Sequence, residues 1–195
     1  MSLWGASDSD ESKPKNLTTA EKKQVFANAS GWVLEAGSPL SGNDNTSATP
    51  EVLVAIGGLA TSLGLADITE VEFKISSFDK SYGGNIDMLV RFNEPVDVTG
   101  TPRVSITNGN QGSGSGRGPH LANYLSGTGS NELTFRCTIA AGNAATNAND
   151  VLVIGANALA QNGGSTIKDA GTNTASTITN AASIGTAAGS ITVTA

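Results

Sequence analysis

The sequence has few of the residues on which most catalytic and metal sites depend. Its 195 residues include one cysteine and one histidine, and only 14% of them are charged. Cys137 cannot form an internal disulfide, and its alternating surroundings in LTFRCTIA predict a buried structural thiol rather than a reactive one. His120, in GRGPHLANY, has no cysteine or carboxylate at ligand spacing, so we expect it in a loop or at the start of a strand.

Clustered basic side chains and long apolar runs are also lacking. The net charge of −6 and the pI near 4.6 argue against nucleic-acid binding, which needs clustered Lys and Arg to contact phosphates. No apolar run approaches the ~20 residues that cross a bilayer, and MSLWGASDSDESKPK is not built like a secretion signal. We therefore expect no nucleic acid, no membrane and no classical export.

The sequence also lacks the patterns that indicate catalysis. The glycine-rich run GNQGSGSGRG at 109–118 has no Gly-Lys-Ser/Thr ending, so it predicts a flexible hairpin tip rather than a phosphate loop. Five aspartates lie in or near turns, without the Asp-x-Asp spacing of a calcium loop: Asp79, Asp87, Asp97, Asp150 and Asp169. No nucleophile–base pair or close carboxylate pair is present. We expect no enzyme, no metal ion and no cofactor.

Glycine, with 24 residues, is abundant together with Ala, Ser, Thr and Asn. This composition favours short strands joined by turns, because Gly, Asn and Ser accept the backbone angles that turns require. From Ile68 onward the apolar residues alternate, as in TEVEFKI and NIDMLVRF, where Met88 and Val90 share one face. RVSIT, LANYLSG, ELTFRCTIA, DVLVIGA and SITVTA continue the pattern. We predict an all-β fold, a β-sandwich over residues 67–195.

The stretch VRFNEPVDVTGTPRVSITNG, residues 90–109, is a test of this prediction. It begins as a strand, and Pro95 and Pro102 remove backbone donors, so both prolines belong at strand edges or bends. We expect a sharp turn at Pro95 and a second strand after it.

Residues 1–66 differ in composition and predict an N-terminal attachment segment. LTTAEKKQVF predicts a short helix at about 19–28, which Thr18 caps and Glu21 completes as a capping box. EVLVAIGGLATSLGLAD is ambiguous between a strand at about 51–56 and a short helix that Gly57 and Gly58 interrupt. We favour the strand because β-branched residues are frequent.

Several residues of this segment are too apolar for a free tail and too few to form a core. They dock either on the chain's own sandwich or on another protein, where tryptophans are common anchors. We favour another protein and name as partner-binding residues Trp4, Leu17, Val25, Phe26 and Trp32.

Ordered motifs in the second part of the chain resemble a bacterial immunoglobulin-like repeat of large surface and adhesin-type proteins. They are Glu94-Pro95-Val96, the VTGTP of 98–102, Ala122 with Tyr124, the SGTGS of 126–130, LTF at 133–135 and IKDAGTN at 167–173. The resemblance spans residues of about 69–175 and implies an immunoglobulin-like β-sandwich. Surface adhesins carry the repeat in tandem, whereas this chain has a single copy and no internal repeat.

The N-terminal MSLWG, LTTAEKK and GWV resemble the start of virion structural proteins from T4-like phages of marine bacteria. Together the two resemblances imply a phage virion structural protein, above all a head-decoration (cement) protein that binds the major capsid protein at the capsid surface. We expect a homo-oligomer. A tail, neck or baseplate protein is one alternative, and a bacterial surface adhesion module is another.

Overall fold

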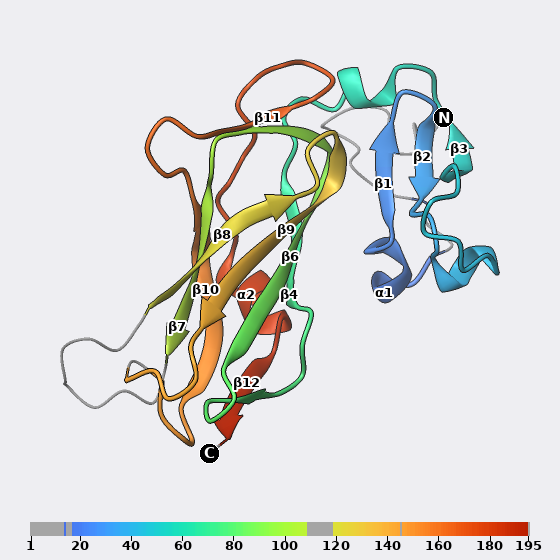
Figure 1. Ribbon diagram of the computed structural model, residues 1–195. Coiled ribbons are helices and arrows are strands. Elements are labelled where there is room, and N and C mark those ends of the chain that lie inside the picture. The colour runs from blue at the N-terminus through green and yellow to red at the C-terminus, as the bar shows by residue number, and fades with distance from the viewer. Residues whose placement is uncertain (1–13, 15–16, 109–118, 145, 195) are drawn as a thin grey trace.

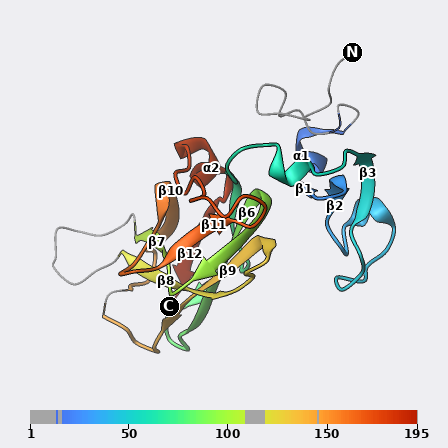
Figure 2. The ribbon, with the colours of Figure 1, turned by 90° about the horizontal axis from the view of Figure 1, so that it is seen from above.

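The computed structural model describes residues 14, 17–108, 119–144 and 146–194. They form two parts that lie side by side in Figures 1 and 2: an N-terminal lobe, residues 17–63, and a larger sandwich, residues 66–194. In these ranges no helix has both the length and the apolar character needed to cross a bilayer.

The N-terminal lobe is a three-stranded antiparallel sheet with short helical turns. Its strands follow the order β1-β2-β3. The elements are α1 (Thr19–Lys22), β1 (Val25–Asn28), β2 (Gly31–Leu34), the 3-10 turn η2 (Pro39–Ser41), β3 (Glu51–Ala55) and the 3-10 turn η3 (Leu59–Thr61). The predicted strand at about 51–56 is confirmed by β3.

The predicted capping box is present, but the helix is shorter than expected. The Thr18 hydroxyl accepts a hydrogen bond from the Glu21 N–H, and the Thr18 N–H donates to the Glu21 carboxylate. The helix ends at Lys22, so its prediction to residue 28 was wrong. Val25–Asn28 instead pair with Gly31–Leu34 as a hairpin. Val25 and Ala27 then face the lobe core on one side of the sheet, and Phe26 is buried on the other.

The lobe has a hydrophobic core of its own. Val25, Ala27, Trp32 and Leu34 pack with Leu59 and Leu63, which come from η3 and the segment after it. The expectation that the N-terminal apolar residues are too few to form a core was therefore wrong. Residues 59–63 supply the missing side chains.

The sandwich is the larger part, and its all-β character confirms the predicted fold class. Its strands are β4 (Ile68–Phe73), β5 (Phe78–Asp79), β6 (Gly84–Thr99), β7 (Arg103–Asn108), β8 (His120–Ser126), β9 (Ser130–Ile139), β10 (Val151–Ala160), β11 (Thr166–Asp169) and β12 (Ser190–Thr194). One helix, α2 (Ala182–Ala187), joins them in the described ranges. The seven predicted alternating segments fall on β4, β6 to β10 and β12, and the short strands β5 and β11 were not predicted.

The strands form one continuous sheet that folds around a single core. Their order is β11-β6-β9-β8-β7-β10-β12-β5, with β4 also paired to β6. β8 connects the two halves because it pairs with both β7 and β9. Helix α2 packs between β10 and β4 (Figure 1). The fold is therefore sandwich-like.

Pro95 does not end the strand. β6 continues from Gly84 to Thr99, with an irregularity in its pairing to β9 between Arg91 and Val96. Before Pro95 the strand pairs with β4, and after it with β11. The expected start of a second strand after Pro95 was wrong: β6 bends near its end (Figure 1) but continues to Thr99. A proline without an N–H is tolerated where a strand changes neighbours. The chain turns later, at Gly100, whose φ is +74°.

Cys137 and His120 lie where the sequence placed them. Cys137 is a buried free thiol in β9, and burial raises its pKa. His120 begins β8, and its Nε2 lies 3.1 Å from the Thr146 hydroxyl, a partner that is itself fully buried. The surroundings of both residues are therefore those of packed structural side chains in the sandwich.

Candidate functional site

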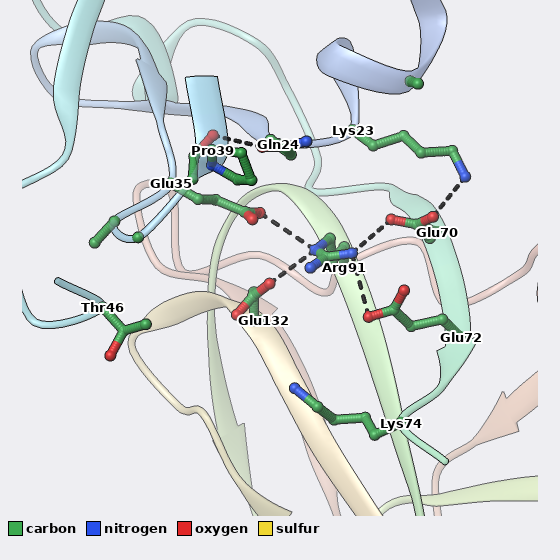
Figure 3. Close-up of a pocket in the computed structure, with 14 residues that line it drawn as sticks. Lys23, Gln24, Glu35, Pro39, Thr46, Glu70, Glu72, Lys74, Arg91 and Glu132 are labelled. Atoms are coloured by element: carbon green, nitrogen blue, oxygen red, sulfur yellow. Dashed lines mark hydrogen bonds and ion pairs between the residues drawn. The ribbon is translucent and has the colours of Figure 1, made fainter. Parts of the chain in front are cut away.

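A polar groove lies between the N-terminal lobe and the sandwich. It has a volume of about 410 Å³, and residues of both parts line it (Figure 3). Its charged lining residues are Lys23 and Glu35 from the lobe and Glu70, Glu72, Lys74, Arg91 and Glu132 from the sandwich. The groove is thus the place where the charges of the two parts meet.

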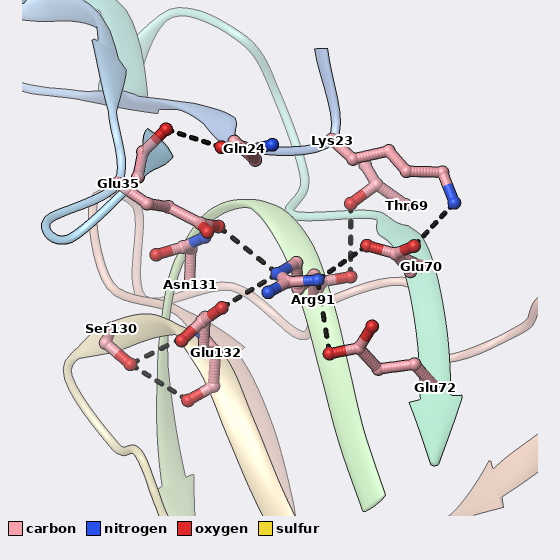
Figure 4. A network of polar contacts seen from close by, with 11 residues as sticks. Lys23, Gln24, Glu35, Thr69, Glu70, Glu72, Arg91, Ser130, Asn131 and Glu132 are labelled. Atoms are coloured by element: carbon pink, nitrogen blue, oxygen red, sulfur yellow. Dashed lines mark hydrogen bonds and ion pairs between the residues drawn. The ribbon is translucent and has the colours of Figure 1, made fainter. Parts of the chain in front are cut away.

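Arg91 occupies the centre of this groove. Its Nη1 lies 2.7 Å from Glu70 Oε2 and its Nε lies 2.7 Å from Glu132 Oε1 (Figure 4). Glu72 Oε1 lies 3.5 Å from Nη1, and Glu35 Oε1 lies 3.4 Å from Nε. With Lys23, these residues are called the Arg91 cluster below: Lys23, Glu35, Glu70, Glu72, Arg91 and Glu132.

Strand register places the central part of the Arg91 cluster. Glu70 of β4 is directly opposite Arg91 of β6, and Arg91 is directly opposite Glu132 of β9. Side chains opposite one another on neighbouring antiparallel strands lie close enough to interact. Three adjacent strands therefore place one carboxylate on each side of a single guanidinium.

The N-terminal lobe adds two charges from different loops. Lys23 follows α1, and its Nζ lies 2.5 Å from Glu70 Oε1. Glu35 follows β2, and besides approaching Arg91 it accepts a hydrogen bond of 2.9 Å from the Asn131 side-chain amide. On the lobe side, the Ser38 hydroxyl donates to the Gln24 side-chain carbonyl. These contacts connect the lobe to three strands of the sandwich.

The pKa values of the central groups reflect this pairing. Burial acts to raise the pKa of Glu70, but hydrogen bonds and charges from Lys23 and Arg91 outweigh burial and hold it below its ordinary value. Burial acts to lower the pKa of Arg91, yet the charges of Glu35 and Glu132 and the Glu70 hydrogen bond raise it. Both groups are therefore firmly ionised at neutral pH.

The arrangement suits attachment between the two parts of the chain. The carboxylates of Glu35, Glu70 and Glu132 are each paired with a cation or an amide donor. Within the described ranges, no three His, Cys, Asp or Glu side chains come together as a metal site. The chemistry that the groove displays is ion pairing.

The residues predicted to bind a partner lie mostly inside the lobe. Val25 and Trp32 are each 1% exposed and belong to the lobe core, so in this conformation they have no surface to offer another protein. Leu17 packs against the same core. Trp4 lies outside the described residues. The structure thus places Val25 and Trp32 in an internal core that the sequence analysis did not foresee, because it counted too few apolar partners for them.

Phe26 faces the sandwich. It is buried and lines a pocket of about 210 Å³ with Asn131 and Glu132 of β9. The strand that carries it, β1, lies beside β6. Of the two docking alternatives, on the chain's own sandwich or on another protein, the first therefore applies to Phe26.

The aspartates singled out in the sequence have separate roles. Asp87 forms a two-pronged ion pair with Arg136, with both distances 2.6 Å. Asp150 accepts hydrogen bonds from the Asn108 side chain and the Asn147 N–H. Asp169 accepts from the Thr172 N–H in the turn after β11. The predicted hairpin tip at 109–118 lies outside the described residues.

Sequence reasoning missed the Arg91 cluster, although a signal for it was present. Glu70 and Glu72 are on the polar face of TEVEFKI, and Arg91 and Glu132 are on the polar faces of two further predicted strands. Alternation identifies such faces but does not say which strands are neighbours. The pairing β4-β6-β9 supplied that information.

Comparisons with known proteins give no relative for this chain. No protein-family profile matches it, and no curated protein and no solved structure matches it significantly. The immunoglobulin-like and virion resemblances therefore stay predictions.

Proposed function

We propose that the chain is a non-enzymatic virion structural protein, a head-decoration protein that binds and stabilises an assembled capsid through the major capsid protein. Binding across several subunits stabilises a shell by mass action, because such a ligand binds the assembled state and not the separated subunits. The role needs an attachment surface and a stable body, and no catalytic group.

One observation supports this proposal most directly: an apolar strand edge on the side of the lobe that faces away from the sandwich. β3 is the end strand of its sheet, and in Figure 1 it lies on that far side. Val52 of β3 is 46% exposed, and Leu40 of η2 is also exposed. An end strand with apolar side chains is a template for pairing with another protein.

This surface replaces the buried residues as the proposed attachment site. Val25 and Trp32 then act indirectly, because they hold β1 and β2 in the sheet that presents β3. Contact with the capsid comes from Val52 and Leu40 on the lobe surface. The end of the sandwich that is remote from the lobe takes no part in this contact.

The experiment compares charged substitutions at the two ends of the protein. We expect Val52→Asp to weaken binding to purified capsids at least about tenfold, a typical loss for a central interface residue. The matched control is Tyr82→Asp, because Tyr82 is 84% exposed in the turn before β6 and lies on the sandwich. Equal binding by both variants and the unmodified chain would contradict the proposed attachment surface.

A gold-labelled antibody against the folded protein tests its location on purified virions. Regular label over the head supports the decoration role. Label confined to the tail would favour the tail, neck or baseplate alternative instead. Label on the bacterial surface and none on virions would favour the adhesion module.

A further inference from the structure

We propose that the groove face of the sandwich also docks the N-terminal lobe of a second copy of this chain, so that copies join by exchanging lobes. The occupant of the groove is then residues 17–63 of the neighbouring copy in place of the chain's own. This inference concerns the chain by itself and does not depend on a virion role.

The connection between the two parts is short and is placed to act as a hinge. Leu63 belongs to the lobe core, and Ala66 belongs to the sandwich core. Gly64 and Leu65 lie between them; Gly64 has a φ of +95°, and Leu65 is 45% exposed. Short connections between separately packed units favour exchange between copies, because a small change in backbone angles redirects the whole unit.

The two hydrophobic cores are separate, so the lobe can leave the sandwich without opening either one. The charged contacts described across the groove are Lys23 with Glu70 and Glu35 with Arg91, and Glu35 also meets Asn131. The interface also buries Phe26 on the side of the lobe that faces the sandwich. Interfaces that include polar contacts between parts of one chain permit relative motion more readily than large, purely apolar ones.

Charge complementarity identifies a second copy as the partner. The lobe presents Lys23 and Glu35 to a sandwich face that holds Glu70 and Arg91, and every copy carries both surfaces. The same ion pairs therefore form between two copies, with the same partner residues as within one chain. Docking within one chain is favoured at low concentration, because the hinge holds the lobe close. Exchange between copies becomes more favourable as the protein concentration rises.

Charge reversal of one pair gives a direct test on the full chain. Lys23→Glu and Glu70→Lys each place like charges across the groove, within one chain and between identical chains. In a mixture of the two, reciprocal exchange restores opposite charges at both docking sites and separates the like charges of each parent chain. We expect each variant alone to have the monomer mass of 19.6 kDa in light scattering, and the mixture to have twice that mass.

The control is the chain that carries both K23E and E70K. It regains an opposite pair internally, so we expect it to remain at the monomer mass. A mixture of the single variants that stays monomeric, while the double variant keeps the compact shape of the unmodified chain in X-ray scattering, would overturn the proposal.

A second measurement uses the unmodified chain and covers the case in which the E70K substitution disturbs Arg91. Equal amounts of ¹⁴N- and ¹⁵N-labelled protein are mixed at high concentration, acidified to protonate the carboxylates, and returned to neutral pH. A carbodiimide then joins Lys23 to Glu70, whose charged atoms are in contact. We expect cross-linked peptides that combine both isotopes, in a fraction that rises with concentration. Peptides of a single isotope at every concentration would refute exchange.

Discussion

The N-terminal lobe and the sandwich reach a folded state by different means. The sandwich surrounds a core to which every strand from β4 to β12 contributes, and the alternating residues of its long strands fill it. The lobe has three strands of four or five residues and, in the described residues, a core of six buried side chains. A small core leaves little stability after the entropy of folding is subtracted, so the lobe depends more on its contacts with the sandwich.

This difference determines where polar contacts contribute most to the stability of the protein. In the sandwich, ion pairs such as that of Asp87 with Arg136 lie on the surface of a sheet that the core already holds together. Between the two parts, the Arg91 cluster is a principal connection besides the hinge. A given ion pair therefore counts for more at the groove than on the face of the sheet.

The largest expected effect comes from emptying either core. Phe135 is fully buried and packs edge-on against Tyr124, with ring centroids 5.9 Å apart. Phe135→Ala should lower the free energy of unfolding by about 3–5 kcal/mol, which moves the midpoint of the main urea transition to a lower urea concentration. Trp32→Ala is the matched change in the lobe, and we expect it to unfold the lobe in a separate early transition. One shared transition in both variants would show that the two parts unfold together.

A smaller effect should follow from removing the cation at the centre of the groove. Arg91→Met leaves the carboxylates of the Arg91 cluster close together without their guanidinium, and loss of one partner of a buried ion pair costs about 3 kcal/mol. The pKa of Glu70 is lower in the folded chain than its ordinary value. The ionised carboxylate therefore stabilises the fold above the ordinary value, and this stability is lost as the pH falls from there through the pKa of the folded chain. The cost of the substitution, measured by urea unfolding, should therefore shrink near pH 3. A cost that is equal at pH 7 and pH 3 would contradict this account.

The smallest effect is a pH dependence that belongs to the sandwich. Burial lowers the pKa of His120, although the charge of Asp150 acts to raise it. The unfolded chain thus binds a proton at His120 more readily, and stability is lost as the pH falls below the ordinary histidine value of about 6.5. Unfolding free energies at pH 7.5 and pH 5 should differ less in His120→Gln than in the unmodified chain. An unchanged difference would remove His120 as its source.

Much of the sandwich could be predicted from the sequence, whereas in the lobe the prediction was right for the capping box and β3 and wrong for β1. Ile86, Met88, Val90 and Phe92 alternate along β6, and each is buried as the pattern requires. Val25 and Phe26 gave no such repeat, because a four-residue strand is too short to separate a strand period from a helix period. The pairing with Gly31–Leu34 decided the outcome.

The sequence by itself determined the all-β fold class, the positions of β4, β6 to β10 and β12, the capping box at Thr18, and the burial of Cys137. These follow from local patterns, in which a residue and its near neighbours carry the information. The tertiary structure decided that residues 59–63 complete the lobe core and that Arg91 meets carboxylates from both parts of the chain. Those contacts join residues far apart in sequence, and their energies depend on which surfaces the fold brings together.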